Sequence, residues 1–551
     1  MQLSPRSQTA PSAPSANAAP AAPSPRAANG ACAPSTGSAA AGPIAVPRRT
    51  PSRTVRRLRA GALAAVCLSL LVGAAPAPEA RGIGDRLFPG LGNPGFDVTA
   101  YDLAFTYSGD NRKPLDAVTT IDARATAALD RVNLDFAHGT VRSVTVNGAP
   151  AGHVAVGQDL VLTPDRPVEE GEPLRITVRH TSDPRTPAES LGEGGWVRTE
   201  DGLAMANQAD AAHRVFPGSD HPSDKARFTF HVTVPKGLTA VANGLPTGRT
   251  PAADGATTWS YRTAHPMATE LAQVSIGRSA VLRRGGPHGV PVRDVIPEAD
   301  RTALEPWLAK TPGQIAWMER RVGRYPFETY GVLAAGATTG FELETQTLSL
   351  FERRMFTEKG YPKGYVDSVM VHELSHQWFG DSVSPRTWSD LWLNEGHASW
   401  YEALYAAEKG GTSLEKRMRA AYGRSDAWRA SGGAPAAPKE PGSGKISIFR
   451  PVVYDGSALV LYALRQEIGA PAFEELERAW VREHRDSTAS TADFVRLASR
   501  TAGRDLDGLL TPWLYGSKTP PMPGHPDWKQ TSEKPKAATR PGPHPAHDTA
   551  K

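Results

Sequence analysis

The sequence predicts an α+β protein of several domains, in which an N-terminal antiparallel β domain precedes a mainly helical domain. Two patterns carry this prediction. Apolar residues recur with a period of two between about residues 95 and 280, and with a helical period from about residue 297 onward. With 551 residues, of which 40% are hydrophobic and 22% charged, the chain is long enough for two or three domains with buried cores.

The two ends of the chain differ in composition from its middle. Residues 1–47 are rich in Ala, Pro and Ser and show no apolar period, which predicts a disordered leader. Residues 519–551 are rich in Pro and Lys, and for the same reason we expect a disordered tail. Both ends carry an excess of basic residues, so the middle of the chain is net acidic although the formal net charge is +5. An acidic folded part argues against nucleic acid as a partner.

Residues 48–80 have the three parts of a bacterial-type signal peptide. Arginines between Arg48 and Arg59 precede an apolar run from Ala60 to Ala75, and small residues follow this run. The run is short for a membrane span. We therefore expect a secreted protein with no stable membrane span after cleavage, and an uncleaved membrane anchor is the alternative. Cys32 and Cys67 both precede residue 80, so the mature domains would have neither disulfides nor cysteine ligands.

Residues 85–285 make up the predicted N-terminal β domain. Short segments in which apolar and polar residues alternate are separated by turn residues such as Asn147-Gly148. The clearest of these segments are 101–107, 118–125, 141–146, 228–234 and 273–276. Such alternation is typical of antiparallel strands with one buried face.

Residues 290–518 make up the predicted second domain. Long segments with a helical apolar period recur at 365–379, 395–408, 454–468, 471–484 and 491–503. We therefore expect this domain to be mainly helical.

The segment VHELSHQWFG at residues 371–380 contains a possible metal-binding pair. His372 and His376 are four residues apart, so on a helix they lie on one face and can bind one ion. Glu373 lies about 100° further round the helix. It can reach a water molecule on the metal without completing the chelate, which suits a general base. The pattern also arises by chance, and two ordinary hydrogen-bonded histidines are then the interpretation.

A third ligand is available further along the chain. Eighteen residues separate His376 from Glu395, which lies in Asn394-Glu395-Gly396 at the start of another predicted helix. A catalytic zinc site has three protein ligands and one open position. Two histidines and one carboxylate from a second helix match this rule, so we expect one Zn²⁺ per chain, bound by His372, His376 and Glu395.

At residues 372–405 the sequence HELSHQWFGDSVSPRTWSDLWLNEGHASWYEALY resembles the aminopeptidase N family of gluzincins, peptidase family M1. That family has H-E-x-x-H, then eighteen residues, then a glutamate in an N-E-G turn. Its tryptophans fall where this chain has Trp378, Trp388 and Trp392. The segments Tyr325-Pro326-Phe327 and 213–225 also look like family segments.

The resemblance covers about residues 95–515 and implies a fold. It implies a saddle-shaped β domain followed by a thermolysin-like catalytic domain. No segment of this sequence resembles the family's C-terminal helical domain, so we expect a two-domain form with a more open substrate chamber.

The resemblance also implies a role for Tyr454. It stands 59 residues after Glu395 in Val453-Tyr454-Asp455-Gly456-Ser457. It is similar to the family's tyrosine that donates a hydrogen bond to the reacting carbonyl oxygen. A lone tyrosine at the start of a helix is otherwise ordinary half-buried packing.

Two further residues are implied to bind the free α-amino group of a substrate. Glu344 lies in GFELETQT at residues 340–347, where the family has its G-A-M-E-N strand. Glu342 is a rival, because residues two apart on a strand point the same way, but Glu-Thr-Gln-Thr resembles the family's continuation after its glutamate. Gln208, five residues before His213, matches a second amine-binding position.

The predicted function is therefore that of a secreted zinc aminopeptidase, which hydrolyses the first bond of peptides with a free N-terminus through a zinc-activated water. One alternative is a zinc endopeptidase or oligopeptidase, or a related hydrolase of the same fold. The altered G-A-M-E-N segment and the missing third domain permit it. The other is a non-enzymatic, peptidase-like binding protein, against which the complete set of ligands, base and tyrosine argues. No feature of the sequence indicates an oligomeric state.

Overall fold

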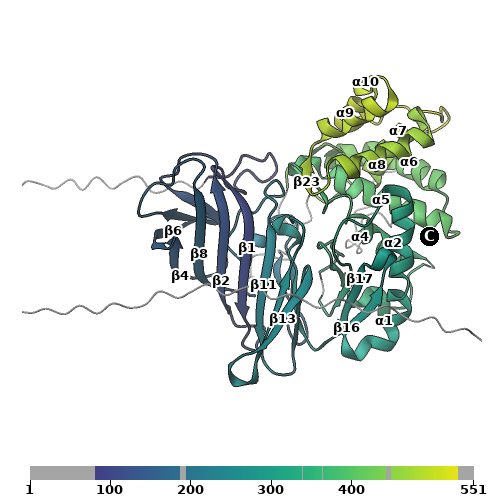
Figure 1. The fold of residues 1–551 in the computed structure, drawn as a ribbon. Coiled ribbons are helices and arrows are strands. Elements are labelled where there is room, and N and C mark those ends of the chain that lie inside the picture. Colours follow the sequence, from purple (N-terminus) through teal and green to yellow (C-terminus); the bar gives the residue numbers. More distant parts are fainter. Residues whose placement is uncertain (1–80, 186–193, 338, 363, 442–447, 532–551) are drawn as a thin grey trace, which may run out of the picture. The chain divides into compact units, whose positions relative to one another are not determined.

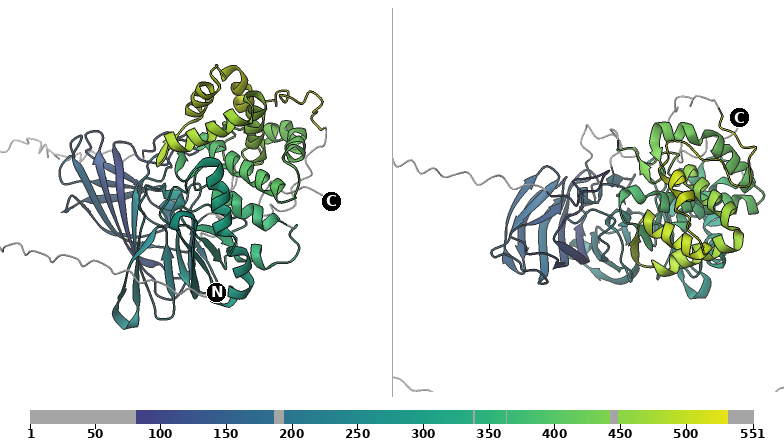
Figure 2. Two further views of the ribbon diagram at one scale, coloured as in Figure 1. Left: turned by 45° about the vertical axis from the view of Figure 1, so that its right-hand side comes forward. Right: turned by 90° about the horizontal axis from the view of Figure 1, so that it is seen from above.

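The computed structural model describes residues 81–185, 194–337, 339–362, 364–441 and 448–531. The predicted leader and signal peptide lie outside these ranges, as does the part of the predicted tail from residue 532. Figure 1 shows strands β1, β2, β8 and β11 side by side, and it shows helices gathered around α4 and α5. The two further views in Figure 2 show the same separation of strands and helices.

Three sheets build the N-terminal part of the described chain. The first has eight strands in the order β13 (Leu245–Pro251), β14 (Thr257–Arg262), β11 (Arg227–Val234), β1 (Phe96–Thr106), β2 (Leu115–Ala125), β8 (Pro173–Ser182), β4 (Val141–Val146) and β5 (Ala149–Pro150). The second has four strands in the order β12 (Thr239–Ala242), β15 (Val274–Gly277), β10 (Leu203–Ala206) and β9 (Gly195–Arg198). The third has three strands in the order β3 (Val132–Asp135), β7 (Asp159–Thr163) and β6 (Gly152–Val156).

The alternation that predicted these strands reflects one buried face. In β11, Phe228, Phe230, Val232 and Val234 are buried, whereas the residues between them are more exposed. These side chains pack in a single core with Leu103 and other inward-facing residues of β1, β2 and β8. The alternation of apolar and polar residues therefore corresponds to one apolar face of the sheet, because successive side chains of a strand point to opposite faces.

One pairing departs from the predicted antiparallel arrangement. β1 pairs with β11 in parallel, with Ala100 opposite Arg227 and Thr106 opposite Thr233. The large sheet is therefore mixed. More than 100 residues separate these two strands, so they are not joined by a hairpin turn that would predict their pairing. The alternating pattern is also the same for parallel and antiparallel pairing.

The C-terminal part combines a mixed sheet with helices. Its sheet has the order β16 (Ser279–Gly285), β17 (Pro291–Pro297), β18 (Val332–Ala335) and β19 (Ser349–Glu352). Two small pairs are β20 (Val383–Pro385) with β23 (Ser487–Ala489), and β21 (Gly433–Ala434) with β22 (Ala437–Pro438). The helices are α1 (Arg301–Leu308), α2 (Thr311–Val322), α3 (Arg353–Thr357), α4 (Tyr365–Ser375), α5 (Trp392–Glu408), α6 (Leu414–Gly432), α7 (Asp455–Ile468), α8 (Ala470–Glu483), α9 (Thr491–Ala502) and α10 (Asp507–Tyr515).

The change from one part to the other comes earlier in the chain than the sequence indicated. β16 spans Ser279–Gly285, within the expected β domain at 85–285, yet it pairs with β17 and so belongs to the sheet that α1 and α3 cover. Strand β15, which ends at Gly277, is the last strand of the N-terminal sheets. The prediction placed the boundary too late because β16 has the same alternating pattern as the strands before it.

The predicted disorder of the tail is wrong for residues 519–531. Met522 and Trp528 are buried, and Trp528 stacks on Tyr462 of α7 with ring centroids 5.7 Å apart. The backbone N–H of Thr531 donates to the carbonyl of Gly423 in α6 at 2.8 Å. The composition suggested disorder because prolines and lysines dominate, but two large apolar side chains suffice to anchor a short segment on α6 and α7.

Trp528 should therefore contribute measurably to stability. We expect Trp528→Ala to lower the free energy of unfolding by about 3 kcal/mol, because it leaves a cavity beside Tyr462 and Tyr422. Urea denaturation followed by circular dichroism measures this change. Lys529→Ala, at an exposed neighbouring position, is the control and should change stability by less than about 0.5 kcal/mol. Equal stability of the two variants would contradict the anchoring of this segment.

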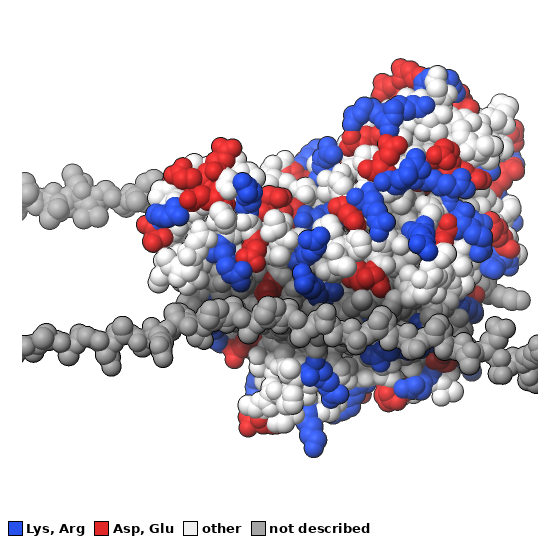
Figure 3. All heavy atoms as spheres, in the orientation of Figure 1, with Lys and Arg blue, Asp and Glu red and all other residues white. Residues whose placement is uncertain are grey.

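Two expectations from the sequence concern the charge of the surface and the presence of membrane-spanning helices. On the face shown in Figure 3, Lys and Arg side chains alternate with Asp and Glu side chains, so this face carries no broad basic surface. Within the described ranges, no helix combines the length and the apolar character that crossing a bilayer requires.

Candidate metal centre

The helix that carries His372 and Glu373 lies in the core. Every residue of α4 from Val366 to Ser375 is buried except Asp367. α4 packs against α5 and α2, and α5 in turn packs against α7. His372, Glu373, His376 and Glu395 are each at most 3% exposed. Four ionisable side chains in such a setting need a common charge partner.

The geometry of three of these side chains fits a zinc ion. Two ligand atoms at about 2.1 Å from zinc, at a tetrahedral angle, lie about 3.4 Å apart. Glu395 Oε2 lies 3.4 Å from His372 Nε2 and 3.6 Å from His376 Nε2. Among the described residues, no donor makes a well-formed hydrogen bond to Glu395 Oε2, although this atom is buried. Two imidazoles and one carboxylate are the donor set that zinc prefers, so the residues fit the predicted ion.

Outer partners orient both imidazoles toward this point. His372 Nδ1 lies 3.1 Å from Glu402 Oε2, and His376 Nδ1 bonds the side-chain oxygen of Asn394. In each case the acceptor holds the proton on Nδ1 and leaves the lone pair of Nε2 facing Glu395. Glu402 stands seven residues after Glu395, two turns along the same face of α5, and this spacing could have identified it from the sequence. Glu402 is therefore a residue beside the site that was not among the predicted ones.

Two glycines permit the close packing of this region. A Cβ atom at Gly396 would lie 2.6 Å from the Cβ of Ser457, so α5 and α7 could not approach so closely with any other residue. Gly380 has a φ of +129°, and a Cβ atom there would lie 2.1 Å from Asn394 Oδ1. The glycines of the N-E-G and W-F-G segments therefore have a steric role beside the site.

Glu373 and Tyr454 are both buried close to the three candidate ligand residues. Burial raises the pKa of Glu373 well above its usual range, and the carboxylates of Glu344, Glu342 and Glu395 raise it further. Burial also raises the pKa of Tyr454 far above its usual value, so its hydroxyl stays protonated and remains a donor. The Tyr454 ring lies with its centroid 6.2 Å from that of His372.

The structure brings Glu344 and Gln208 together with this cluster from two different parts of the chain. Gln208 Nε2 donates to Glu344 Oε1 at 2.6 Å, and Asn394 Nδ2 donates to the same oxygen at 2.9 Å. One carboxylate oxygen of Glu344, one of Glu373 and one imidazole nitrogen of His376 lie within 4.8 Å of one another. Burial favours the neutral form of Glu344, but His376 and these two donors hold its pKa below the usual range.

The rival Glu342 has a different environment. The segment around it is irregular, with one isolated bridge between Leu343 and Leu350, so the strand argument from alternation does not apply. Burial, together with the nearby carboxylate of Glu352, raises the pKa of Glu342 to about 8. Glu344, rather than Glu342, shares its carboxylate with Gln208 and Asn394. Of these two carboxylates, Glu344 is therefore the one that these amide donors hold beside His376.

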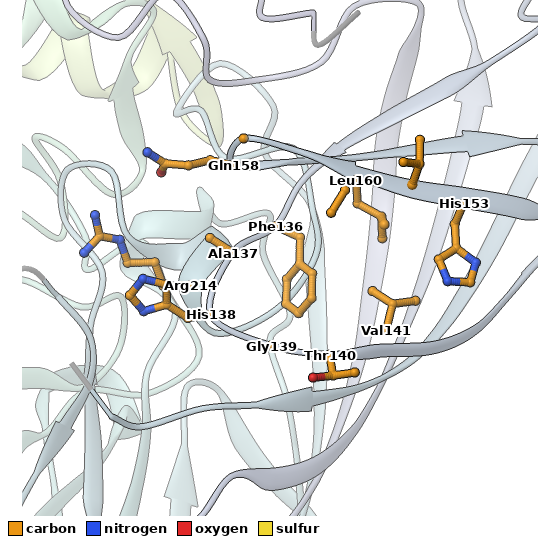
Figure 4. Close-up of a pocket in the computed structure, with 13 residues that line it drawn as sticks. Phe136, Ala137, His138, Gly139, Thr140, Val141, His153, Gln158, Leu160 and Arg214 are labelled. Carbon is orange, nitrogen blue, oxygen red and sulfur yellow. The ribbon is translucent and has the colours of Figure 1, made fainter. Parts of the chain in front are cut away.

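A cavity in the N-terminal part is separate from this cluster. It has a volume of about 870 Å³ and is lined by residues around Phe136, His138, His153 and Arg214, shown in Figure 4. None of the predicted site residues lines it. It therefore adds nothing to the metal centre.

Comparison with known proteins agrees with these observations. The family model described as Peptidase M1 N-terminal domain matches residues 98–271, and the model described as Peptidase family M1 domain matches residues 309–513. Aminopeptidase M1-B of Oryza sativa is 26% identical over 56% of this chain and 36% of its own length. Aminopeptidase N of Streptomyces lividans is 26% identical over 55% of this chain and 36% of its own length. The chain thus spans little more than a third of these curated relatives.

Solved structures cover the chain more fully. An M1 zinc metallopeptidase from Deinococcus radiodurans has 27% sequence identity and a TM-score of 0.69, and the match covers 83% of this chain and 100% of that one. A mutant of that protein, bound to a Tyr-Ser-Ala substrate, has 28% identity and a TM-score of 0.68, with 80% and 100% covered. These matches confirm the predicted β-rich N-terminal domain and helical catalytic domain.

Proposed function

The chain belongs to peptidase family M1, and we propose that it is a zinc-dependent aminopeptidase that removes the first residue of peptides with a free N-terminus. The observation that carries this proposal is the position of Glu344. Its Oε1 lies 4.0 Å from Nδ1 of His376, and one polar atom from each of Glu344, Glu373 and His376 lies within 4.8 Å of the other two. A substrate ammonium held there has its first peptide bond beside the base and the metal ligands.

His372, His376 and Glu395 would hold the zinc ion, which when bound would supply a Lewis acid and lower the pKa of a water molecule. Glu373 follows the ligand His372 directly and is buried in the same cluster. Its carboxylate accepts the proton of the attacking water and returns that proton to the leaving amine.

Tyr454 has a separate role in this scheme. Its protonated hydroxyl donates a hydrogen bond to the oxygen of the scissile carbonyl as negative charge develops there. The buried setting strengthens this interaction, because little water competes for the oxygen.

Glu344 and Gln208 select the cleavage position. Glu344 is ionised and buried, and it offers a charge-assisted hydrogen bond to an ammonium group. Gln208 holds the same carboxylate from the β domain and fixes its orientation. A peptide whose amine is acetylated has no charge to place there and loses this interaction.

We expect Glu344→Gln to lower kcat/KM for free-amine substrates by about 100-fold, which corresponds to about 2.7 kcal/mol for a lost buried charge pair. Hydrolysis of leucine 4-nitroanilide under initial-rate conditions measures it. Glu342→Gln is a matched control of the same size and charge change, two residues away. A larger loss in Glu342→Gln than in Glu344→Gln would assign the amine to Glu342.

The decisive experiment compares amino-acid arylamides with their N-acetylated forms, together with the metal content of the purified protein. The proposal requires zinc near one equivalent and cleavage of the free-amine substrate at least about 100 times faster, given the energy of the charge pair. Equal cleavage of both forms, or cleavage inside long peptides, identifies an endopeptidase or oligopeptidase. Bound zinc without hydrolysis of any peptide identifies a non-enzymatic binding protein.

We also propose that the protein is secreted. The basic, apolar and small-residue stretches of residues 48–80 support this, and they lie outside the described residues. Expression of the full chain in a bacterial host, with sequencing of the N-terminus of protein from the medium, tests it. Protein retained in the membrane with residues 48–80 intact would identify an uncleaved anchor.

A further inference from the structure

Arg417 on α6 joins two acidic residues from two other helices. Its Nη1 lies 3.1 Å from Glu402 Oε1 on α5, and its Nη2 lies 3.0 Å from Asp455 Oδ1 at the start of α7. A second nitrogen reaches each carboxylate, with Nε 3.2 Å from Asp455 Oδ1 and Nη2 3.4 Å from Glu402 Oε2. Glu402 and Asp455 are each 2% exposed. Their charges are therefore compensated mainly by this guanidinium.

Each of the two carboxylates leads to a residue of the proposed catalytic site. Glu402 Oε2 lies 3.1 Å from Nδ1 of the proposed ligand His372. Asp455 directly follows Tyr454 in the chain, and Tyr454 is the N-cap of α7. Arg417 on a third helix therefore contacts both carboxylates. One of them faces the proposed metal ligand His372, and the other adjoins the proposed oxyanion donor Tyr454.

The chemistry of arginine suits this position. The guanidinium presents a planar fork of donors that can serve two carboxylates at once, whereas an ammonium group is a point charge without fixed directions. Rotation of α7 about its axis would move Tyr454, and the bonds to Asp455 oppose that rotation. Loss of the bonds to Glu402 would let this carboxylate turn away from His372 Nδ1, which controls the orientation of the ring.

We propose that Arg417 is a positioning residue that fixes the positions of the His372 and Tyr454 side chains relative to each other. It touches neither substrate nor metal, and it acts through Glu402 on one side and Asp455 on the other. The proposal rests on the proposed function, since it assumes that His372 binds zinc and that Tyr454 assists catalysis. Sequence patterns gave no indication of it, because the three residues come from three helices.

The test uses the full chain with Arg417→Met, Tyr454→Phe and the double variant. We expect Arg417→Met to release zinc to a chelator about 10 to 100 times faster and to lower kcat by a similar factor, as for other partners outside the ligand set, with little change in KM. In the Tyr454→Phe background, the loss of kcat caused by Arg417→Met should be several-fold smaller, because the hydroxyl that it positions is already absent. Arg417→Lys should recover only part of the activity.

Arg429→Met is the matched control. Arg429 lies on the same helix, is buried, and donates to the backbone carbonyls of Trp513 and Gly516 at 2.6 and 2.7 Å. Its loss should lower the thermal midpoint without changing zinc release or kcat. If Arg417→Met behaves like Arg429→Met, Arg417 is only a structural link and the proposal is wrong. Fully additive losses of kcat in the double variant would also contradict the claim that Arg417 positions Tyr454.

Two isosteric variants keep the proposal testable if Arg417→Met does not fold. Glu402→Gln should speed zinc release, whereas Asp455→Asn should lower kcat and leave zinc release unchanged. The opposite assignment, or no change in either, contradicts the proposal. Zinc release is measured without substrate, so it tests the effect of Arg417 on His372 independently of activity. A wild-type protein that binds zinc but lacks aminopeptidase activity would refute the proposed function and leave this test intact.

Discussion

Replacement of Glu373 by glutamine is expected to lower kcat by about 10³- to 10⁴-fold while the protein keeps its zinc, because a general base contributes up to about this factor. Glutamine has nearly the same shape as glutamate but cannot accept a proton from water. The three proposed ligand residues are untouched by the change, so metal content should stay the same. Atomic emission for zinc and initial rates on an amino-acid arylamide measure the two quantities separately.

A matched control for Glu373→Gln exists in Glu477→Gln. Glu477 is likewise buried, and it accepts a hydrogen bond from Tyr401 and faces His397 on the far side of α5. This control should keep most of its activity. Turnover of Glu373→Gln within about tenfold of the unmodified protein would remove Glu373 as the base, since that loss is below the usual contribution of a general base.

Replacement of Glu395 by alanine is expected to remove both the metal and the activity. It eliminates the carboxylate whose Oε2 lies 3.4 and 3.6 Å from the two imidazole nitrogens. Two histidines alone bind zinc weakly, and the loss of Lewis-acid stabilisation costs several kcal/mol, on the order of 10³-fold or more in rate. Zinc analysis after dialysis and kcat/KM on the same arylamide measure this outcome.

Chelation of the unmodified protein should reproduce this loss, and addition of zinc should reverse it. The same addition should not restore Glu395→Ala at equal concentrations. An alanine variant that retains stoichiometric zinc after dialysis would contradict Glu395 as the third ligand. Activity that persists in the metal-free unmodified protein would contradict the proposed chemistry as a whole.

Much of the fold could be predicted from local patterns. The period of two in β11 and the helical periods at 365–379 and 395–408 correspond to elements that the structure contains. The direction of β11 beside β1 could not be predicted, because alternation is identical in parallel and antiparallel strands. Residues 519–531 were misjudged from composition, since burial of Met522 and Trp528 depends on the faces of α6 and α7 that receive them.

The sequence by itself determined that His372 and His376 share a helix face, because a four-residue spacing on a helix fixes which side chains lie together. It also supplied Glu395 as the candidate for a third ligand. Only the tertiary structure decided that Gln208 bonds Glu344 across 136 residues, and that Arg417 links Glu402 with Asp455. The reason is physical. Helical and strand periods arise from backbone geometry over a few residues, whereas these contacts depend on how whole helices and sheets pack against one another.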